Sequence, residues 1–295
     1  MNAPLVSVLM PAYNAGKYIG EAIESVLQSS FQDFELIICD DKSTDDTAKI
    51  ALSYLQKDNR VRVYLNEKNL GDYPNRNKVA SYANGTYLKY LDADDIIYPW
   101  GLGVMVHCMQ AQPTAGFGLM SSTLYQQHPF PIIVNNITAY RHYFFDKVLA
   151  IGPTGSIIKK DVFNGVNGFS GKPYVGDVEL WLTLSQKYDM VRMPTDIVWY
   201  RLHETQESKR ELLDPSNTLR RYKIYEWALE SENCPLPENE RTLALQNHKK
   251  VSIRLAAINN LKSFKFFKYY QFCKACNFKF VDFCRAFTKA KKPNL

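Results

Sequence analysis

The sequence contains no run of apolar residues long enough to form a membrane-spanning helix, which needs about 20 in succession. The charge-free region at residues 96–140 is interrupted by Pro99, Pro113, Gln126, Gln127, Pro129 and Asn135. The first residues also include no basic segment, long apolar core or cleavage site, so we expect no signal peptide. We therefore expect a cytoplasmic protein that does not cross the membrane.

Two glycine-rich phosphate-binding motifs are missing as well. No Gly-x-Gly-x-x-Gly follows the first expected strand, which disfavours a dinucleotide-binding fold, and the P-loop pattern Gly-x-x-x-x-Gly-Lys-Ser/Thr does not occur. The six cysteines do not form a spaced framework, so we expect them to be reduced. Cys273 and Cys276 lack a second pair or a nearby His that would complete a metal site, and we predict that they are core residues.

Basic residues are concentrated in one part of the chain. Residues 262–292 contain nine Lys or Arg and one acid, so this segment carries +8 in a chain of 295 residues whose net charge is +6. The remainder is slightly acidic. With 46% hydrophobic residues, the chain has the composition of one large globular domain with an appendage.

Strand-like and helix-like segments alternate over the first 91 residues. Short apolar runs bounded by breakers predict buried strands at residues 6–11, 34–40, 61–65 and 87–91, and apolar residues at helical spacing predict helices between them. The third of these helices is expected at residues 74–83. Because parallel neighbours need crossover connections, this alternation predicts an α/β fold with a mostly parallel sheet.

Polar clusters follow three of these strands, at residues 11–14, 40–41 and 92–95. Ligands of open parallel sheets bind beyond the carboxyl ends of the strands, so we expect the clusters to form one site. Asp92, Asp94 and Asp95 place three carboxylates in four positions, where a divalent cation or hydrogen-bond donors would offset the like charges. The alternative is a solvated turn, in which Asp is common.

Four ordered motifs carry a family resemblance: residues 7–14 (SVLMPAYN), 40–47 (DDKSTDDT), 74–77 (PNRN) and 91–95 (LDADD). In this order they resemble the motifs of family-two glycosyltransferases of GT-A type, over roughly the first two-thirds of the chain. The resemblance implies a mostly parallel mixed sheet flanked by helices, Rossmann-like, with a C-terminal helical extension. It also implies inverting sugar transfer from a nucleotide-diphosphate sugar to an acceptor hydroxyl.

The same resemblance assigns the nucleotide-sugar site. It implies that Pro11, Tyr13, Asn14 and Asp41 line the nucleoside pocket, with Asp41 accepting a hydrogen bond from the base, although Asp41 could instead cap a helix. Lys42 departs from the small residue usual at its position. Arg76 is expected to face the diphosphate, because a guanidinium matches phosphate oxygens. Its alternative is a solvated helix arginine.

Asp92, Ala93 and Asp94 match the family's metal-binding motif. A Mn²⁺ or Mg²⁺ ion prefers carboxylate and phosphate oxygens and would neutralise the leaving diphosphate. The resemblance implies that Asp94 and Asp95 contact the metal and the donor sugar, with Asp92 turned toward the ribose.

Two later segments are expected to complete the donor-sugar and acceptor side of the site. One segment resembles the family segment that lies beside the donor sugar; it contains Thr154, Gly155 and Ser156. Gly155 also suits a simple tight turn. Residues 174–184 resemble the family's Glu-Asp helix start, with Gly176 in place of the usual Glu and Asp177 retained. Inverting displacement needs a carboxylate that takes the proton of the acceptor hydroxyl, and Asp177 is our candidate.

The alternative interpretation of Asp177 is a carboxylate stabilised by a helix N-terminus. Glu179 is the weaker candidate base, and we group Glu179 and Trp181 with the acceptor and donor-sugar wall. Residues 198–203 resemble the family's closing strand. Alternation along that strand would let Arg201 contact the diphosphate and His203 the metal from the same side.

The basic, aromatic tail at residues 264–287 has two interpretations. It could be an amphipathic helix on an anionic membrane surface, or a helix packed on the catalytic domain with a solvated basic face. We expect a GT-A catalytic domain at residues 1–205, with a nucleotide-binding half at about 1–98 and an acceptor half at about 99–205. A helical basic region is expected at residues 206–295.

Together these features predict a hexosyl- or N-acetylhexosaminyltransferase of cell-surface polysaccharide biosynthesis that uses a UDP-sugar. We expect a glycan acceptor that is linked to lipid, no nucleic-acid partner, and a location on the inner face of the cell membrane. The first alternative is a nucleotidyltransferase, which would be expected to begin with a basic Gly-rich loop where this chain has Pro11 and Tyr13. The second is a catalytically dead module that binds nucleotide or nucleic acid.

Overall fold

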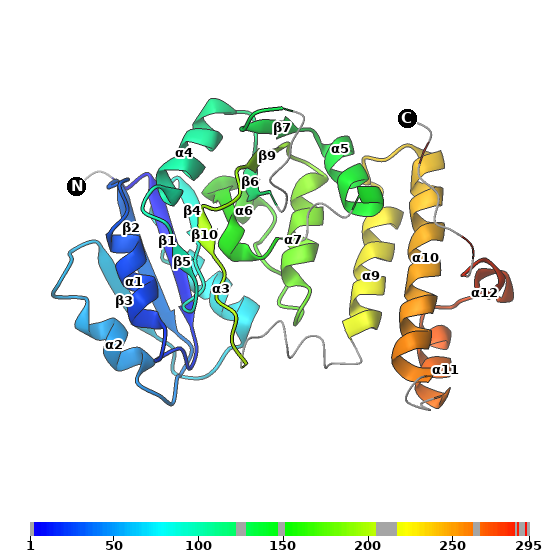
Figure 1. The fold of residues 1–295 in the computed structure, drawn as a ribbon, viewed down its shortest axis with the longest axis horizontal. Helices are drawn as coiled ribbons and strands as arrows, with labels where there is room; N and C mark the ends of the chain where they lie inside the picture. The colour runs from blue at the N-terminus through cyan, green and yellow to red at the C-terminus, as the bar shows by residue number, and fades with distance from the viewer. Residues whose placement is uncertain are drawn as a thin grey trace. The chain divides into compact units, whose positions relative to one another are not determined.

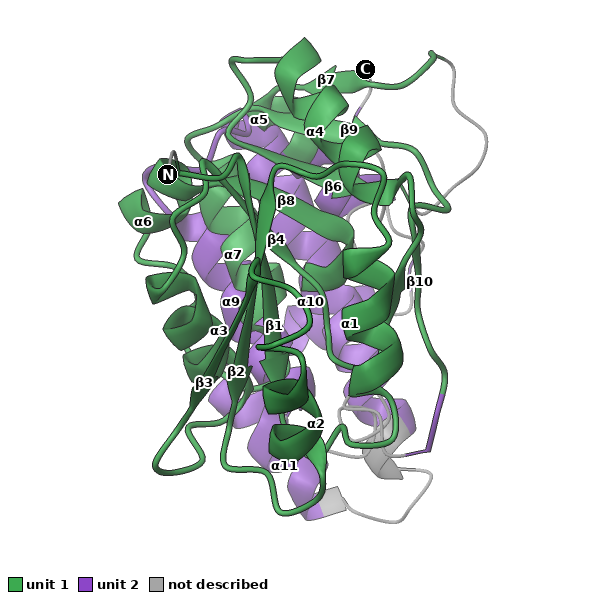
Figure 2. Ribbon diagram, turned by 90° about the vertical axis from the view of Figure 1, so that its left-hand side faces the viewer, with its two compact units in different colours: residues 1–139, 148–202 green, residues 140–147, 203–295 purple. Residues whose placement is uncertain are grey.

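The structure is a computed structural model that describes residues 3–121, 128–146, 151–204, 217–261 and 266–286, together with residues 288 and 293. Figure 1 shows its helices and strands in chain order. The chain divides into two compact units, residues 1–139 with 148–202 and residues 140–147 with 203–295 (Figure 2). The domain boundaries expected after residues 98 and 205 stay predictions. No helix among the described residues is long and apolar enough to cross a membrane.

The first unit begins with the predicted alternation of strands and helices. These elements are β1 (Val6–Ala12), α1 (Ile19–Leu27), β2 (Phe34–Asp40), α2 (Thr47–Ser53), β3 (Val61–Leu65), α3 (Asp72–Ser81) and β4 (Tyr87–Tyr90). The bounds of β2 and β3 agree with the prediction. Helix α3 begins two residues early, at Asp72, because Pro74 fits the first turn of a helix, where an N–H has no intrahelical partner.

The rest of this unit completes a mixed sheet. Its elements are β5 (Ile96–Ile97), α4 (Gly101–Ala111), β6 (Phe117–Met120), β7 (Ile132–Val134), α5 (Asn136–Arg141, which continues into the second unit), the turn η2 (Pro153–Gly155), β8 (Ser156–Lys159), α6 (Lys160–Gly165), α7 (Gly176–Ser185), β9 (Met190–Met193) and β10 (Val198–Trp199). Eight strands pair in the order β3-β2-β1-β4-β8-β6-β9-β7, and β10 pairs with β5 alone.

The first four strands are parallel, whereas β8 is antiparallel to both β4 and β6. Strand β9 is parallel to β6 and antiparallel to β7. Helices α1, α2 and α4 pack with one face of the sheet in a large apolar cluster, and α3, α6 and α7 lie on the other face (Figure 2). This arrangement confirms the predicted fold class.

The carboxyl ends of β1, β2 and β4 meet at one edge of the sheet because the three strands are parallel neighbours. The Asp41 N–H donates to the carbonyl oxygen of Ala12 at 2.8 Å, and the Leu91 N–H donates to that of Leu9 at 2.9 Å. These bonds continue the sheet just past the strand ends. They bring the polar residues that follow each strand to the same edge.

The second unit is helical. It contains the π-helical turn η1 (His142–Asp146), α9 (Asn217–Glu230), α10 (Glu238–Leu261), α11 (Phe266–Ala275) and α12 (Phe280–Ala286). The expectation of one helix over residues 264–287 is wrong, because α11 ends at Ala275 and Asn277 adopts a positive φ of 50° before α12 begins. Cys273 and Cys276 are buried in an apolar cluster with Tyr222, as predicted for core cysteines. All six cysteines are free.

Candidate active site

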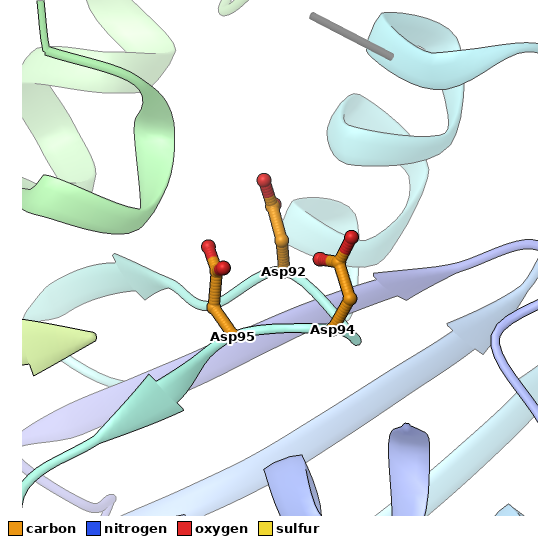
Figure 3. Close-up of side chains that lie close together, drawn as sticks. All are labelled: Asp92, Asp94 and Asp95. Carbon is orange, nitrogen blue, oxygen red and sulfur yellow. The ribbon is translucent and has the colours of Figure 1, made fainter. Parts of the chain in front are cut away.

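The acidic residues that follow β4 form a tight turn at the carboxyl edge of the sheet. The Asp95 N–H donates to the carbonyl oxygen of Asp92 at 3.0 Å, and the three carboxylates project to the same side (Figure 3). One oxygen from each of Asp92, Asp94 and Asp95 lies within 4.8 Å of the others. Clustered carboxylate oxygens suit a hard divalent cation, so the residues present fit a Mn²⁺ or Mg²⁺ site.

Asp95 is the buried member of this cluster, with 3% of its surface exposed. Burial, followed by the charges of Asp92 and Asp94, raises the pKa of its carboxyl group to about 7. The solvated-turn alternative therefore fails for Asp95. A bound dication would offset the repulsion that raises this pKa.

Among the described residues of the site, the positive charge nearest to Asp92 is that of Arg76 on α3. Its Nη1 lies 2.6 Å from Asp92 Oδ1 and its Nε lies 2.8 Å from Asp72 Oδ1, while the arginine is only 6% exposed. Burial lowers the pKa of Arg76, but the two carboxylates outweigh burial and raise it well above its usual value. The alternative of a solvated helix arginine is therefore wrong. A direct contact of Arg76 with the diphosphate stays a prediction.

A buried lysine lies beneath the acidic turn and was not among the predicted site residues. Lys89 is fully buried on β4, and its ammonium donates to the carbonyl oxygens of Tyr90 and Thr154. Burial lowers the pKa of Lys89 to about 7, against the opposing charges of Asp92 and Asp95. A lysine inside an otherwise apolar strand was the sequence signal that could have identified it.

The predicted donor-sugar wall lies against the acidic turn. The Asp92 N–H donates to Thr154 Oγ1 at 3.0 Å, and Thr154 and Ser156 are both fully buried. Gly155 has no space for a side chain, because a Cβ there would lie 2.4 Å from Ile151 Cγ2 and 2.6 Å from the hydroxyl oxygen of Tyr200. The turn therefore packs tightly between the acidic cluster and the segment that follows β10.

Two residues grouped with that wall lie elsewhere in the first unit. Trp181 is 1% exposed, donates from Nε1 to the Ile151 carbonyl oxygen at 2.8 Å, and stacks on Phe117, so it is a core residue behind the wall. Glu179 is 8% exposed and accepts hydrogen bonds from Ser170 and Lys172. These contacts tie Glu179 to the loop that precedes α7.

Asp177 lies in the first turn of α7 and is half-buried. The hydroxyl of Tyr73, on α3, donates to Asp177 Oδ1 at 3.3 Å. A Cβ at Gly176 would lie 2.8 Å from the Tyr73 ring. The tyrosine ring thus occupies the space of a side chain at residue 176, which explains why glycine replaces the family's usual Glu.

Helix α3 connects the candidate base with the acidic cluster. Tyr73 contacts Asp177, and Arg76, three residues later, contacts Asp92. Residues at this spacing lie on the same face of a helix. One turn of α3 therefore positions both groups of carboxylates.

The predicted nucleoside pocket is built from the loops after β1 and β2. Asp41 is 2% exposed, and its carboxylate accepts hydrogen bonds from Asn66 Nδ2 at 2.8 Å, Leu70 N at 2.8 Å and Gly71 N at 2.9 Å. A carboxylate has about four acceptor positions, so one is left for a base N–H. Lys42 is exposed and has a positive φ of 63°, a conformation that explains the usual preference for a small residue there.

Asn14 joins the two loops of this pocket. Its N–H donates to Ser43 Oγ at 2.9 Å, and its Oδ1 accepts from the Thr44 N–H at 2.8 Å. Pro11 is buried at the end of β1, whereas Tyr13 is 50% exposed. The binding roles of these residues stay predictions.

The closing strand is shorter than expected. Strand β10 ends at Trp199, so strand alternation does not relate Arg201 to His203, and that part of the prediction is wrong. Arg201 donates from its backbone N–H to Asp95 Oδ1 at 3.0 Å and from Nε to the Asp94 carbonyl oxygen at 2.8 Å. Its Nη2 also lies 2.6 Å from Glu21 Oε2, so Arg201 braces the acidic turn. His203 belongs to the second unit, and its predicted role at the metal stays a prediction.

Known proteins resemble the chain at the level of sequence and fold. A Staphylococcus aureus TarS structure in complex with UDP-GlcNAc superposes with a TM-score of 0.71 at 20% identity, covering 96% of this chain and 81% of that one. The mannosyltransferase PcManGT of Pyrobaculum calidifontis, in complex with GDP-Man and Mn²⁺, superposes with a TM-score of 0.60 at 12% identity, covering 97% and 88%. These likenesses concern the fold, which is of GT-A type.

Among curated relatives, the Escherichia coli UDP-Glc:alpha-D-GlcNAc-diphosphoundecaprenol beta-1,3-glucosyltransferase WfgD is 40% identical over 96 residues. The alignment covers 32% of this chain and 37% of WfgD, so the chain matches little more than a third of that relative's length. The family model described as "Glycosyl transferase family 2" matches residues 7–164, more than half of the chain. The chain therefore belongs to glycosyl transferase family 2.

Proposed function

We propose that this protein is an inverting, metal-dependent glycosyltransferase that moves a hexose or N-acetylhexosamine from a UDP-sugar to a glycan hydroxyl. The observation that carries the proposal is that one turn of α3 contacts two separate carboxylates. Tyr73 contacts Asp177, and Arg76 contacts Asp92 of the acidic cluster. The site would thus offer a base for the acceptor and a separate group of oxygen ligands for a metal ion that neutralises the leaving diphosphate.

Asp177 would take the proton of the acceptor hydroxyl while that oxygen attacks the anomeric carbon of the donor. Tyr73 orients the Asp177 carboxylate through Oδ1. The nucleoside would lie over the loops that contain Pro11, Tyr13 and Asn14, with its base at the remaining acceptor position of Asp41. Arg76 and Arg201 keep the acidic turn in place and lie at the diphosphate end of the site.

Asp94 and Asp95 would hold the metal. A bound Mn²⁺ or Mg²⁺ ion neutralises the negative charge of the leaving nucleoside diphosphate. Support for metal use comes from the three carboxylates of the turn, and the structural neighbour PcManGT was determined with Mn²⁺. UDP is the expected nucleotide, since TarS was determined with UDP-GlcNAc and WfgD is named for UDP-Glc.

The acceptor would be a saccharide linked to lipid, in the synthesis of a cell-surface polysaccharide at the inner face of the cell membrane. WfgD is named for such an acceptor, a saccharide on diphosphoundecaprenol. On α11 and α12, Phe267, Tyr270 and Phe280 are 70%, 61% and 84% exposed. Lys268 follows Phe267 directly, and Lys279 directly precedes Phe280. Exposed aromatic rings beside lysines suit the surface of an anionic membrane.

A product-release assay tests the proposed reaction. The protein is incubated with a panel of UDP-, GDP- and dTDP-sugars, with Mn²⁺, with Mg²⁺ or with EDTA, and nucleoside diphosphate is measured. We expect release from one or two UDP-sugars, dependent on metal. Release that is equal in EDTA, or no release from any donor with a membrane extract as acceptor source, would contradict the proposal.

Co-sedimentation with vesicles tests the membrane proposal separately. The 295-residue chain should pellet with vesicles that contain anionic lipid and stay in the supernatant with neutral vesicles. The variant in which Phe267, Tyr270 and Phe280 are all replaced by Ser should lose this binding. A variant with Ser at Leu52, Leu55 and Leu65, exposed side chains of the first unit, is the matched control and should bind like the parent. Unchanged binding of the first variant would refute membrane contact through these helices.

A further inference from the structure

Lys89 on β4 is fully buried and forms no ion pair with any residue that the structure describes. Its ammonium donates to two main-chain oxygens, the carbonyl oxygen of Tyr90 at the end of β4 and that of Thr154 in the turn η2. Lysine is almost never fully buried without a charged partner, because burying an ammonium is costly. A methionine would fill a similar space at lower cost, so the ammonium requires an explanation.

The two carbonyl oxygens lie where the pairing of β4 with β8 has ended. These strands pair only at Tyr87 with Lys159 and at Leu88 with Ile158. Beyond those pairs, the ammonium of Lys89 connects the end of β4 with η2, which directly precedes β8. The lysine therefore joins two segments at the point where the strand pairing no longer holds them together.

These two segments carry the acidic turn and a threonine that contacts it. Tyr90 lies two residues before Asp92, the first residue of the acidic turn. Thr154 Oγ1 accepts from the Asp92 N–H at 3.0 Å, and the threonine side chain also forms a hydrogen bond with the Asp95 carboxylate. By holding η2 at the end of β4, Lys89 keeps the threonine in contact with both ends of the acidic turn.

We infer that Lys89 is a positioning residue that holds η2 against the acidic turn and thereby orients Asp95 for the bound metal ion. It acts through the hydrogen bonds of its ammonium and not by contact with substrate. Removing a group that orients a metal ligand commonly weakens the binding of the metal. This inference rests on the proposed function, which assigns the metal to Asp94 and Asp95.

Lys89→Met tests this role, because methionine has a similar length but donates no hydrogen bond. Isothermal titration measures the affinity of parent and variant for Mn²⁺, with and without UDP, and for UDP in EDTA. We expect the variant to bind Mn²⁺ about tenfold more weakly. UDP in EDTA should bind within about twofold of the parent, because the predicted nucleoside pocket is built from the loops after β1 and β2.

The direction of the change separates positioning from charge. Removing a positive charge near Asp92 and Asp95 would by itself strengthen the binding of a cation. Weaker binding of Mn²⁺ by Lys89→Met would therefore indicate lost positioning. Unchanged or tighter binding would overturn the inference.

Thr154→Val gives a second test that leaves the lysine in place. It removes the hydroxyl that contacts the acidic turn but keeps the carbonyl oxygen that accepts from Lys89. Alone it should weaken Mn²⁺ binding about tenfold. In this background Lys89→Met should add little, because the connection to Asp95 is already broken. Parent-like Mn²⁺ affinity of Thr154→Val would overturn the inference even if Lys89→Met does not fold, and fully additive losses would do the same.

Lys160→Met is the matched control. Lys160 Nζ donates to the main-chain carbonyl oxygen of Ala83 at 2.6 Å, and its backbone N–H donates to that of Thr86, which precedes β4. This lysine thus lies at the end of β4 opposite the acidic turn, and its variant should bind Mn²⁺ like the parent. An equal loss in both lysine variants would indicate a general effect on the fold and would overturn the inference. A parent protein that binds Mn²⁺ neither alone nor with UDP would instead contradict the metal dependence in the proposed function.

Discussion

Tyr73 and Arg76 lie three residues apart on α3, and they hold the two carboxylates on which the proposed reaction depends. Tyr73 donates to Asp177 Oδ1 at 3.3 Å, and Arg76 Nη1 lies 2.6 Å from Asp92 Oδ1. Both side chains are almost completely buried. A single helical turn therefore fixes the base and one member of the acidic cluster, so a change in either residue is expected to affect catalysis.

Replacing Tyr73 by Phe should slow transfer by about three- to tenfold, because Asp177 loses a donor that orients it. The KM for the donor sugar should change little, since the nucleotide lies elsewhere. In an Asp177→Asn background the same replacement should have almost no further effect, because its target carboxylate is already absent. Steady-state kinetics of the two single variants and the double variant measure this coupling. Fully additive losses would contradict it.

Replacing Arg76 by Met should destabilise the first unit by about 3 kcal/mol, because Asp72 and Asp92 would keep their charges without a partner. We expect a loss at the lower end of the range usual for a broken buried ion pair, because the side chains of Asp72 and Asp92 are 25% and 30% exposed. Urea unfolding measures the change. The control is Lys49→Met, which removes an exposed pair with Asp46 and should cost less than about 0.5 kcal/mol. Similar losses in both variants would contradict a special role for Arg76.

Mn²⁺ should raise the melting temperature of the parent protein in the absence of nucleotide. A metal that binds only the folded state at ten times its Kd stabilises that state by roughly 1.4 kcal/mol. Asp94→Ala should abolish this increase, whereas Asp58→Asn should retain it, because Asp58 pairs with Arg60 outside the site. EDTA should reverse the effect. An equal shift in parent and Asp94→Ala would show that the metal binds elsewhere.

His248 should make the second unit sensitive to acid. Its ring stacks on Tyr222 at 4.9 Å and lies edge-on to Tyr225 at 4.8 Å, and burial lowers its pKa to about 4, although the Tyr222 carbonyl and Glu226 oppose this shift. Between pH 6.5 and 4 the unfolded chain binds a proton that the folded chain does not bind. Stability should therefore fall as the pH falls through this window, by about 3 kcal/mol.

The variant His248→Gln isolates this contribution, because glutamine can still bond to the Tyr222 carbonyl but does not titrate. Its unfolding free energy should depend on pH less steeply than that of the parent between pH 6.5 and 4. Chemical unfolding at several pH values measures both curves. Parallel curves would contradict the assignment to His248.

The sequence patterns predicted the positions of the first strands better than the side-chain contacts. β2 and β3 have the predicted bounds because each is a short apolar run between breakers. The contacts of Arg76 could not be predicted, since they depend on the phase of α3, which begins at Asp72 rather than Pro74. The link between Tyr73 and Asp177 joins residues 104 positions apart, beyond the reach of any local pattern.

Other differences arise where tertiary contacts decide the structure. The alternation argument at the closing strand failed because β10 pairs with only the two residues of β5 and ends at Trp199. Lys89 was not predicted as a site residue, because it looked like part of a strand. Its importance follows from burial and hydrogen bonding, which the sequence does not display.

The most direct test of the central claim compares the parent with Asp177→Asn and Asp94→Ala in nucleoside-diphosphate release from the preferred UDP-sugar, at saturating Mn²⁺. We expect Asp177→Asn to lose at least about 100-fold in rate, because no carboxylate takes the acceptor's proton, while its affinity for UDP stays close to that of the parent. Asp94→Ala should lose both rate and metal dependence. An Asp177→Asn enzyme as fast as the parent would contradict the proposed mechanism.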